Sequence, residues 1–367
     1  VRAQLTESLA RADEALGFSE VGEEQYVTPT GDGFVELDEE VKEQRISAQD
    51  ELLSSAVKEQ QLAEQLGEKS RFEELLDADP LTAHIQSMMS ELTGTPLNLP
   101  VPRDFLAAVE LKVQQKFNSD TKGGRYSARD SYCRLQGIRR ELRSILSGNS
   151  SQLMTAPGAA EVQQTRKVFD SLVYVAWVES QYKPTVCSSA GARGMWQFIP
   201  STARRYDMVV DQQVDERCQW RKATASAAGY FSFLLGHFDG YPFLALAAYN
   251  AGENAIDRRV IRDPDIPKHL RNFYGFTAAG VLHPETMKYV PSIVASAFIG
   301  SAAENSGKGD PADPMADYTE ARRLWTNKYP NSRRVKLWDR CTSVERAAPV
   351  NLNCRAAGAR SPCKGIP

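Results

Sequence analysis

Apolar residues recur at helical spacing along most of this chain, and alternating runs typical of β-strands are scarce. The stretch from Leu37 to Leu76 is rich in Glu, Gln, Lys, Ala and Leu, which favour helix, so we expect one or two long, mostly solvated helices there. The proline-containing segment Leu92–Pro102 predicts a boundary, and a second helical block follows from Arg103 to about Leu146. The pattern therefore predicts a mainly α fold.

The middle of the chain has the most strongly apolar helices. One is expected from about Glu161 to Ser180, ended by Pro184. The run Leu244–Tyr249 is apolar on every side, which is typical of a helix buried all round, and a last helix is expected at Pro284–Ala297. A stripe with a period near 3.6 residues predicts one more helix between them: Ala227, Phe231, Leu234, Leu235 and Phe238.

The chain has 367 residues, more than one hydrophobic core usually needs, and polar segments with Gly and Pro divide it into three parts. Residues 1–150 form a helical accessory region, which ends in a hinge at 147–158. Residues 151–302 form the domain with the candidate chemistry. Residues 303–367 comprise a linker at Glu304–Pro314, one helix at about Ala316–Tyr329 and a cysteine-containing tail.

Charge is distributed unevenly along the chain. The first 100 residues contain 7 Lys/Arg and 22 Asp/Glu, and because the whole chain has a net charge of −3, the remainder carries +12. This basic remainder suits an acidic partner. It shows no stripe of Lys/Arg interleaved with aromatic residues, so we expect no nucleic-acid partner. No run approaches the ~20 apolar residues that a membrane helix needs, so we expect no transmembrane segment.

The cysteine pattern favours an exported protein. None of the six cysteines forms a Cys-x-x-Cys pair, and the four histidines lack zinc spacing, so we expect no metal site and no peptidase or amidase chemistry. An even cysteine number suits disulfides, with fifteen possible pairings, of which we favour Cys187–Cys218. The alternative is six reduced thiols in a cytosolic protein. No signal peptide begins at Val1, so we expect any export signal to have been removed or to lie outside the given sequence.

Glu179 is the candidate general acid. It follows Leu172, Val175 and Ala176 at helical spacing, so it lies on an otherwise apolar helix face. A carboxyl among apolar side chains has its charged form disfavoured, which raises its pKa and lets it hold a proton near neutral pH. The alternative is a structural carboxylate paired with an arginine.

A glycine loop follows this helix. Gly191 and Gly194 indicate a sharp turn or a close approach of the backbone. Beyond them, Trp196 and Gln197 offer an aromatic platform and an amide, the pair that a sugar ring with an N-acetyl group would use. The alternatives are a core tryptophan and a glutamine that caps a helix.

Two further polar pairs stand at helix ends. Tyr249 and Asn250 end the buried helix, where polar side chains usually line a cleft. Glu285 and Tyr289 are one helical turn apart and share a face of the last helix. For Glu285 the alternative is stabilisation of the helix start, because an acid there suits the helix dipole.

Together these motifs resemble the lysozyme-like catalytic domain of lytic transglycosylases that cut bacterial peptidoglycan. The resemblance runs from about Arg166 to Ala302. The chain has Met195-Trp196 before the motif glutamine, which is similar to the membrane-bound D-type subgroup, but no repeated glycan-binding module follows residue 302. The motifs that carry the resemblance are, in order, Glu179-Ser180, Ser188, Gly191-x-x-Gly194-x-x-Gln197, Pro200-x-Thr202-Ala203, Ala248-Tyr-Asn-Ala-Gly252 and Glu285-Thr-x-x-Tyr289.

The resemblance implies a single catalytic residue, Glu179, acting as acid and then base without a cofactor. It implies cleavage of the β-1,4 bond between N-acetylmuramic acid and N-acetylglucosamine, with a 1,6-anhydro product, and a periplasmic or secreted protein whose partners are peptidoglycan strands. The residues it implies at the sugar sites are Ser188, Met195, Gln197, Tyr249, Asn250, Glu285 and Tyr289. Two alternatives stay open: hydrolysis, as in goose-type lysozymes, and a non-catalytic glycan-binding protein.

Overall fold

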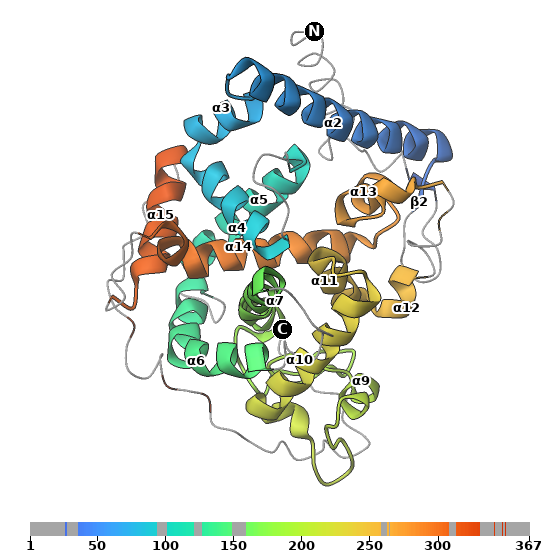
Figure 1. The fold of residues 1–367 in the computed structure, drawn as a ribbon. Coiled ribbons are helices and arrows are strands. Elements are labelled where there is room, and N and C mark those ends of the chain that lie inside the picture. The colour runs from blue at the N-terminus through green and yellow to red at the C-terminus, as the bar shows by residue number, and fades with distance from the viewer. Residues whose placement is uncertain are drawn as a thin grey trace. The chain divides into compact units, whose positions relative to one another are not determined.

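The fold is mainly α, as predicted, and Figure 1 shows its helices along the chain. The two strands of the described chain, β1 (Tyr26–Val27) and β2 (Glu36–Leu37), form one short antiparallel pair. Within the described residues, no helix has both the length and the apolar character needed to cross a membrane. The computed structural model describes residues 26–27, 36–93, 101–120, 127–148, 159–257, 263, 265–307, 313–330, 341, 347 and 349.

The described part of the chain is built from helices of 4 to 28 residues, with two 3₁₀ turns, η5 (Glu216–Cys218) and η7 (Lys268–Leu270). In chain order the α-helices are α2 (Glu39–Leu66), α3 (Arg71–Ala78), α4 (Pro80–Thr93), α5 (Arg103–Ser119), α6 (Ala128–Gly148), α7 (Ala159–Ser171), α8 (Val173–Ser180), α9 (Pro200–Arg205), α10 (Trp220–His237), α11 (Pro242–Ala251), α12 (Glu253–Ile256), α13 (Phe273–Ala278), α14 (Pro284–Ser306) and α15 (Ala316–Lys328).

These elements form two compact units, and each unit combines two separate stretches of sequence. One unit comprises Val1–Lys112 and Phe238–Val294. The other comprises Val113–His237 and Ala295–Pro367. The division into residues 1–150, 151–302 and 303–367 stays a prediction.

In the first unit, α2 packs against α13, so one face of a helix that was expected to be mostly solvated is buried. Arg45 is buried and donates from Nε to the carbonyl of Ala278 at 2.8 Å, while Lys42 Nζ lies 2.9 Å from Asp263 Oδ2. Long polar side chains can bury their aliphatic stems, which a hydropathy pattern does not show. The buried residues of α2 are Arg45, Ile46, Ala48, Gln49, Leu52, Ser55, Ala56, Glu59, Gln60 and Ala63.

In the second unit, α6 packs against α7, α8 and α10. The predicted stripe on α10 is confirmed, because Ala227, Phe231 and Leu234 are fully buried. A disulfide joins Cys133 to Cys341, whose Cα atoms are 5.5 Å apart.

The favoured cysteine pair is not found. Cys187 and Cys218 both take part in disulfides, but among the described residues no bond joins these two to each other. The bond described in full is instead the long-range one between α6 and Cys341. The expectation of disulfides is therefore confirmed, whereas the favoured pairing of Cys187 with Cys218 is wrong.

The helix expected from Glu161 to Ser180 is two helices, α7 and α8, that meet at Leu172. The N–H of Leu172 bonds to the carbonyl of Phe169, three residues back, so the chain tightens there into a 3₁₀-type turn. The second helix ends at Ser180, with Gln181 as its C-cap, before Pro184.

Two other boundaries also differ from expectation. The last helix of the central region, α14, continues to Ser306 and takes in the start of the expected linker. The predicted helix near Ala316 is confirmed as α15. Most of the hinge at 147–158 lies outside the described residues.

Candidate functional site

Glu179 lies near the C-terminal end of α8, on the face that the sequence predicts. The residues behind it on that face are buried, with exposed fractions of 5% for Leu172 and 0% for Val175 and Ala176. Glu179 itself is half-buried. Its carboxyl is therefore set at the rim of an apolar helix face, where the group still reaches the surface.

Helix α8 ends in a left-handed turn of two residues that are not glycine. Gln181 and Tyr182 have φ of 55° and 62°. Their N–H groups donate to the carbonyls of Trp177 and Ala176 at 3.0 and 3.2 Å, which satisfies the last turn of the helix. The left-handed conformation costs roughly 1–2 kcal/mol per residue, and burial of Tyr182 (1% exposed) offsets this. The turn fixes how α8 presents Glu179.

Ser180 connects this helix to the glycine loop. Its Oγ donates to the carbonyl of Met195 at 2.7 Å and contacts the carbonyl of Ala176 at 3.3 Å. Ser180 is 5% exposed, so the bond is shielded from water. The residue next to Glu179 therefore holds α8 against the loop Gly191–Gln197.

The loop needs glycine at two positions, for different reasons. Gly191 and Gly194 both have positive φ, 82° and 89°. A Cβ at Gly191 would meet nothing within 4 Å, whereas a Cβ at Gly194 would lie 1.9 Å from the carbonyl oxygen of Arg217. Gly191 therefore serves the turn alone, and Gly194 also allows a close approach of two backbone segments.

A buried ion-pair network supports the same loop. Arg217 donates from Nη1 to the carbonyls of Gly191 and Phe198, both at 2.8 Å. Its Nε and Nη2 donate to Asp215 at 2.9 and 2.8 Å, and Arg193 Nη1 donates to the same carboxylate at 3.1 Å. Sequence reasoning missed this network, because its bonds join backbone carbonyls to side chains that no periodic pattern marks.

The electrostatics of Asp215 follow from this arrangement. Burial of the carboxyl raises its pKa, but the hydrogen bonds and charge of Arg217, together with the charge of Arg193, outweigh that effect. The pKa of Asp215 is therefore lowered below its usual value. The carboxylate stays ionised and acts as a fixed anchor for the loop.

The loop side chains take different places. Met195 and Trp196 are 0% exposed, and Trp196 Nε1 donates to Thr224 Oγ1 at 2.9 Å, so the core interpretation of Trp196 is confirmed. Met195 was expected to contact sugar, but its buried side chain has no surface to offer. Gln197 is half-buried and donates from Nε2 to the carbonyls of Val186 and Gly194 at 3.1 and 2.8 Å, so it fastens the loop and caps no helix.

Ser188 closes a small turn at the start of the loop. Its Oγ accepts from the N–H of Ala192 at 3.0 Å, its own N–H donates to the Ala192 carbonyl at 2.9 Å, and its carbonyl accepts from the N–H of Gly191. The side chain is half-buried. Its hydroxyl therefore stabilises the loop turn, and the exposed part of the side chain is accessible to a ligand.

In the first unit, Tyr249 and Asn250 end helix α11, which is buried all round from Phe243 to Ala248 as predicted. Both residues are half-buried. Asn250 Oδ1 accepts from Thr286 Oγ1 at 2.8 Å, which ties the end of α11 to the first turn of α14. This hydrogen bond of Thr286 was not predicted, although the residue lies within a motif that the sequence singles out.

Glu285 and Tyr289 share a spacing of one turn but not an environment. Glu285 is exposed and its N–H donates to Nδ1 of His283 at 3.1 Å, so the histidine caps the first turn of α14. Tyr289 is 8% exposed. The expected helix-start position of Glu285 is thus observed, and its exposed carboxylate is also open to a ligand.

The eight predicted residues divide between the two units. Glu179, Ser188, Met195 and Gln197 belong to one unit, and Tyr249, Asn250, Glu285 and Tyr289 belong to the other. In each unit a neighbouring hydroxyl holds one of these residues: Ser180 bonds to the carbonyl of Met195 in one, and Thr286 bonds to the side chain of Asn250 in the other.

Residues 159–270 match the family described as "Transglycosylase SLT domain". The chain carries an SLT domain. The resemblance to lytic transglycosylases is thereby confirmed, and the domain includes Glu179, the glycine loop and the end of α11. Glu285 and Tyr289 lie beyond the matched residues.

Relatives of the chain are found in bacteria and a phage. "Membrane-bound lytic murein transglycosylase D" of Escherichia coli (strain K12) is 31% identical over 150 residues, which cover 41% of this chain and 31% of the relative. "Peptidoglycan transglycosylase gp16" of Escherichia phage T7 is 39% identical over 89 residues, which cover 24% of this chain and 7% of the relative. The chain thus spans about a third or less of these two relatives.

Proposed function

We propose that the protein is a peptidoglycan lytic transglycosylase that acts in the bacterial cell envelope. The observation that carries this is the half-buried Glu179 at the end of an apolar helix face, held beside a glycine loop within an SLT domain. The names of the relatives, which describe murein or peptidoglycan transglycosylases, support the same substrate. The basic character of the chain after residue 100 also suits an acidic polymer.

Glu179 acts first as a general acid and then as a general base. It gives its proton to the oxygen between N-acetylmuramic acid and N-acetylglucosamine, and the bond from that oxygen to C1 of the muramyl ring breaks. The acetamide oxygen of the same sugar attacks C1. Glu179, now a carboxylate, takes the proton of the C6 hydroxyl as O6 displaces the acetamide, which closes a 1,6-anhydro ring and restores the acid. No water is consumed, and substrate assistance removes the need for a second carboxylate.

Six other residues are proposed to bind the sugars or to orient their acetamide groups. Gln197 is suited to this because both bonds of its side chain use Nε2, and among the described residues none is seen to Oε1. The exposed Glu285 and the half-buried Tyr249 can accept and donate hydrogen bonds to sugar hydroxyls. The proposed set is Ser188, Gln197, Tyr249, Asn250, Glu285 and Tyr289.

Product analysis tests the proposal. Purified protein and its Glu179→Gln variant are incubated with peptidoglycan, and the released muropeptides are analysed by mass spectrometry. We expect 1,6-anhydro-muramyl products, and we expect the variant to form them at least a hundredfold more slowly, since a positioned acid and base contributes about 10²–10⁴. Reducing ends would instead indicate hydrolysis, and equal clearing of cell walls by the variant would show that Glu179 is not the catalyst.

A further inference from the structure

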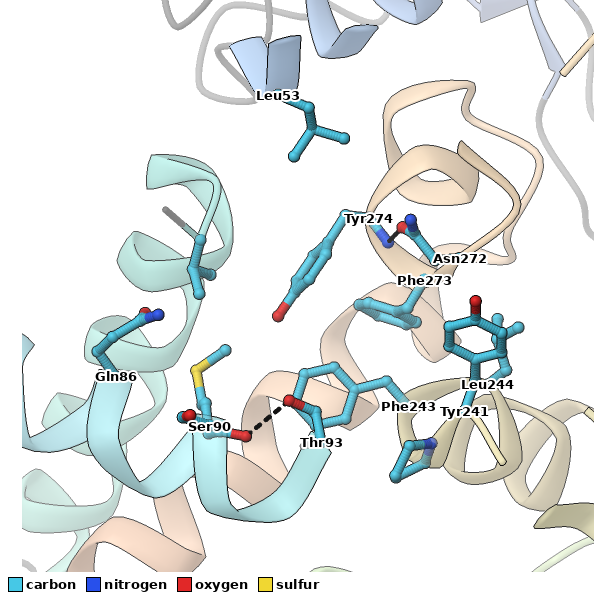
Figure 2. A pocket seen from close by; sticks show the side chains of 13 residues that line it. Leu53, Gln86, Ser90, Thr93, Tyr241, Phe243, Leu244, Asn272, Phe273 and Tyr274 are labelled. Carbon is cyan, nitrogen blue, oxygen red and sulfur yellow. Dashed lines mark hydrogen bonds between the residues drawn. The ribbon is translucent and has the colours of Figure 1, made fainter. Parts of the chain in front are cut away.

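A pocket of about 230 Å³ lies in the first unit, near the beginning of α11. Its walls come from α2, α4, α11 and α13, and the residues proposed to bind sugar at the other end of α11 do not line it. The lining residues are Leu53, Gln86, Met89, Ser90, Thr93, Val101, Tyr241, Pro242, Phe243, Leu244, Asn272, Phe273 and Tyr274, shown in Figure 2.

Aromatic rings shape the inner wall of this pocket. Phe243 and Phe273 are buried, with their rings edge to face at 6.1 Å. The ring of Tyr274 meets that of Phe243 at 6.1 Å, again edge to face, and Phe105 stacks behind Phe243 at 5.6 Å. Such a wall is rigid and favours an apolar or aromatic occupant.

The hydroxyl of Tyr274 is a hydrogen-bond donor that faces the space. In Figure 2 the ring of Tyr274 projects into the pocket, with its hydroxyl directed between Gln86 and Phe243. The main-chain N–H of Tyr274 donates to Asn272 Oδ1 at 3.0 Å, but within the described part of the chain no partner is seen for the hydroxyl. Burial raises the pKa of Tyr274 above its usual value, so the phenol is neutral and remains a donor.

Two other polar lining side chains, Thr93 and Asn272, use their oxygen atoms in bonds to the main chain. Thr93 Oγ1 donates to the carbonyl of Met89 at 2.9 Å, and Asn272 Oδ1 accepts from two main-chain N–H groups of α13. None of the thirteen lining residues carries a formal charge. A sugar ring or a charged peptide would leave its own polar groups unmatched here, which costs binding free energy.

We propose that this pocket is a second ligand site, which takes a neutral, ring-sized apolar group carrying one hydrogen-bond acceptor. The acceptor bonds to the Tyr274 hydroxyl, and the apolar body fills the space against Phe243 and Phe273. The size is suitable, since an engineered apolar cavity of about 150 Å³ in another protein binds benzene. The site does not depend on the proposed reaction of Glu179.

Binding is tested with acetophenone, a ring with one carbonyl acceptor, titrated into the full chain with labelled Leu and Met methyl groups. We expect saturable NMR shifts at Leu53 and Met89, with a dissociation constant of about 1 mM or lower. Toluene is the probe without an acceptor, and benzoate is the charged probe, which we expect to bind at least tenfold more weakly. Absence of saturable shifts at these two methyl groups, or benzoate binding as tight as acetophenone binding, overturns the proposal.

Two variants distinguish the contribution of the hydrogen bond to binding from that of the pocket volume. Tyr274→Phe removes only the hydroxyl, so acetophenone binds about three- to tenfold more weakly while toluene binding is unchanged. Ser90→Leu fills part of the pocket and weakens both probes. Thermal unfolding verifies that each variant is folded. Tyr274→Phe is expected to be as stable as the parent, because its hydroxyl has no hydrogen-bond partner among the described residues. Unchanged acetophenone binding in either variant places the ligand elsewhere and overturns the site.

Discussion

Arg134 on α6 donates from Nε to the main-chain carbonyl of Gln181 at 2.8 Å. Gln181 is the left-handed residue that ends α8, two positions after Glu179. A guanidinium from a neighbouring helix thus holds the carbonyl at the point where the helix with the proposed acid stops. Hydrogen bonds of charged groups contribute about 1.5–3 kcal/mol, enough to decide whether this strained turn keeps one conformation.

Replacing this arginine should lower kcat without raising KM. In Arg134→Met the carbonyl of Gln181 loses its partner, the end of α8 becomes less fixed, and the proposed acid spends less time in its working position. We expect kcat for muropeptide release to fall about tenfold, and we expect the dependence of kcat on pH to differ from that of the parent. The matched control is Arg140→Met, because Arg140 lies exposed on the same helix. If both variants keep the parental kcat and profile, Arg134 has no positioning role.

The two loop glycines should respond differently to the same substitution. Gly191→Ala meets open space, so it suffers only the left-handed strain of about 1–2 kcal/mol. Gly194→Ala has that strain and also brings a Cβ to 1.9 Å from a carbonyl oxygen of Arg217, so the backbone must move. We expect Gly194→Ala to lose at least about 3 kcal/mol of stability in urea unfolding and most of the activity. Equal losses in the two variants would contradict the close approach.

The sequence predicts the central helices and the place of Glu179 well, because both depend on local periodicity. Helix α11 is buried as expected, and the face of α8 behind Glu179 is apolar in sequence and in structure. The burial of one face of α2 was not predicted. Arg45 and Gln49 are buried there, and because long polar side chains can bury their hydrocarbon stems, a hydropathy pattern classes such residues as exposed.

The hydrogen bonds that stabilise the backbone around the candidate site could not be predicted from sequence patterns. Arg217 donates to backbone carbonyls up to 26 residues away, and Arg134 donates to one that is 47 residues away. Such contacts depend on the fold and leave no spacing in the sequence. The disulfide partner of Cys133, 208 residues distant, is unpredictable for the same reason.

Asp215 should make the stability of the protein depend on pH in the acid range. Its folded-state pKa is lowered, so the unfolded chain binds the proton more readily, and its contribution is complete above the ordinary carboxyl pKa of about 3.9. The contribution is lost as pH falls through the lower, folded-state pKa. We expect the free energy of unfolding in urea to fall less steeply with decreasing pH for Asp215→Asn than for the parent. The exposed Asp207→Asn is the control and should keep the parental slope.

At neutral pH, Asp215→Asn should also be less stable than the parent. Arg217 is 5% exposed, so the variant leaves a buried guanidinium without its counter-charge, which costs about 3–5 kcal/mol. Because Arg217 holds the carbonyls of Gly191 and Phe198, the glycine loop is expected to loosen with it. If Asp215→Asn is as stable as the parent, the buried ion pair of Asp215 and Arg217 contributes no more to the free energy of unfolding than a solvent-exposed ion pair does.

The disulfide Cys133–Cys341 should stabilise the unit that contains the proposed acid. It closes a loop of 208 residues, and in the chain-entropy model such a bond constrains the unfolded state by about 5 kcal/mol, with 2–4 kcal/mol typical of measured cases. Cys133 also precedes Arg134 on α6, so the bond restrains the same turn of the helix that holds Gln181. We expect the double variant Cys133→Ser/Cys341→Ser to unfold at lower urea concentration. We also expect its kcat at 25 °C to be lower than that of the parent under conditions in which the variant is still folded. If the double variant keeps full kcat while its stability falls, the disulfide serves folding alone and Arg134 is held in place by the packing of α6.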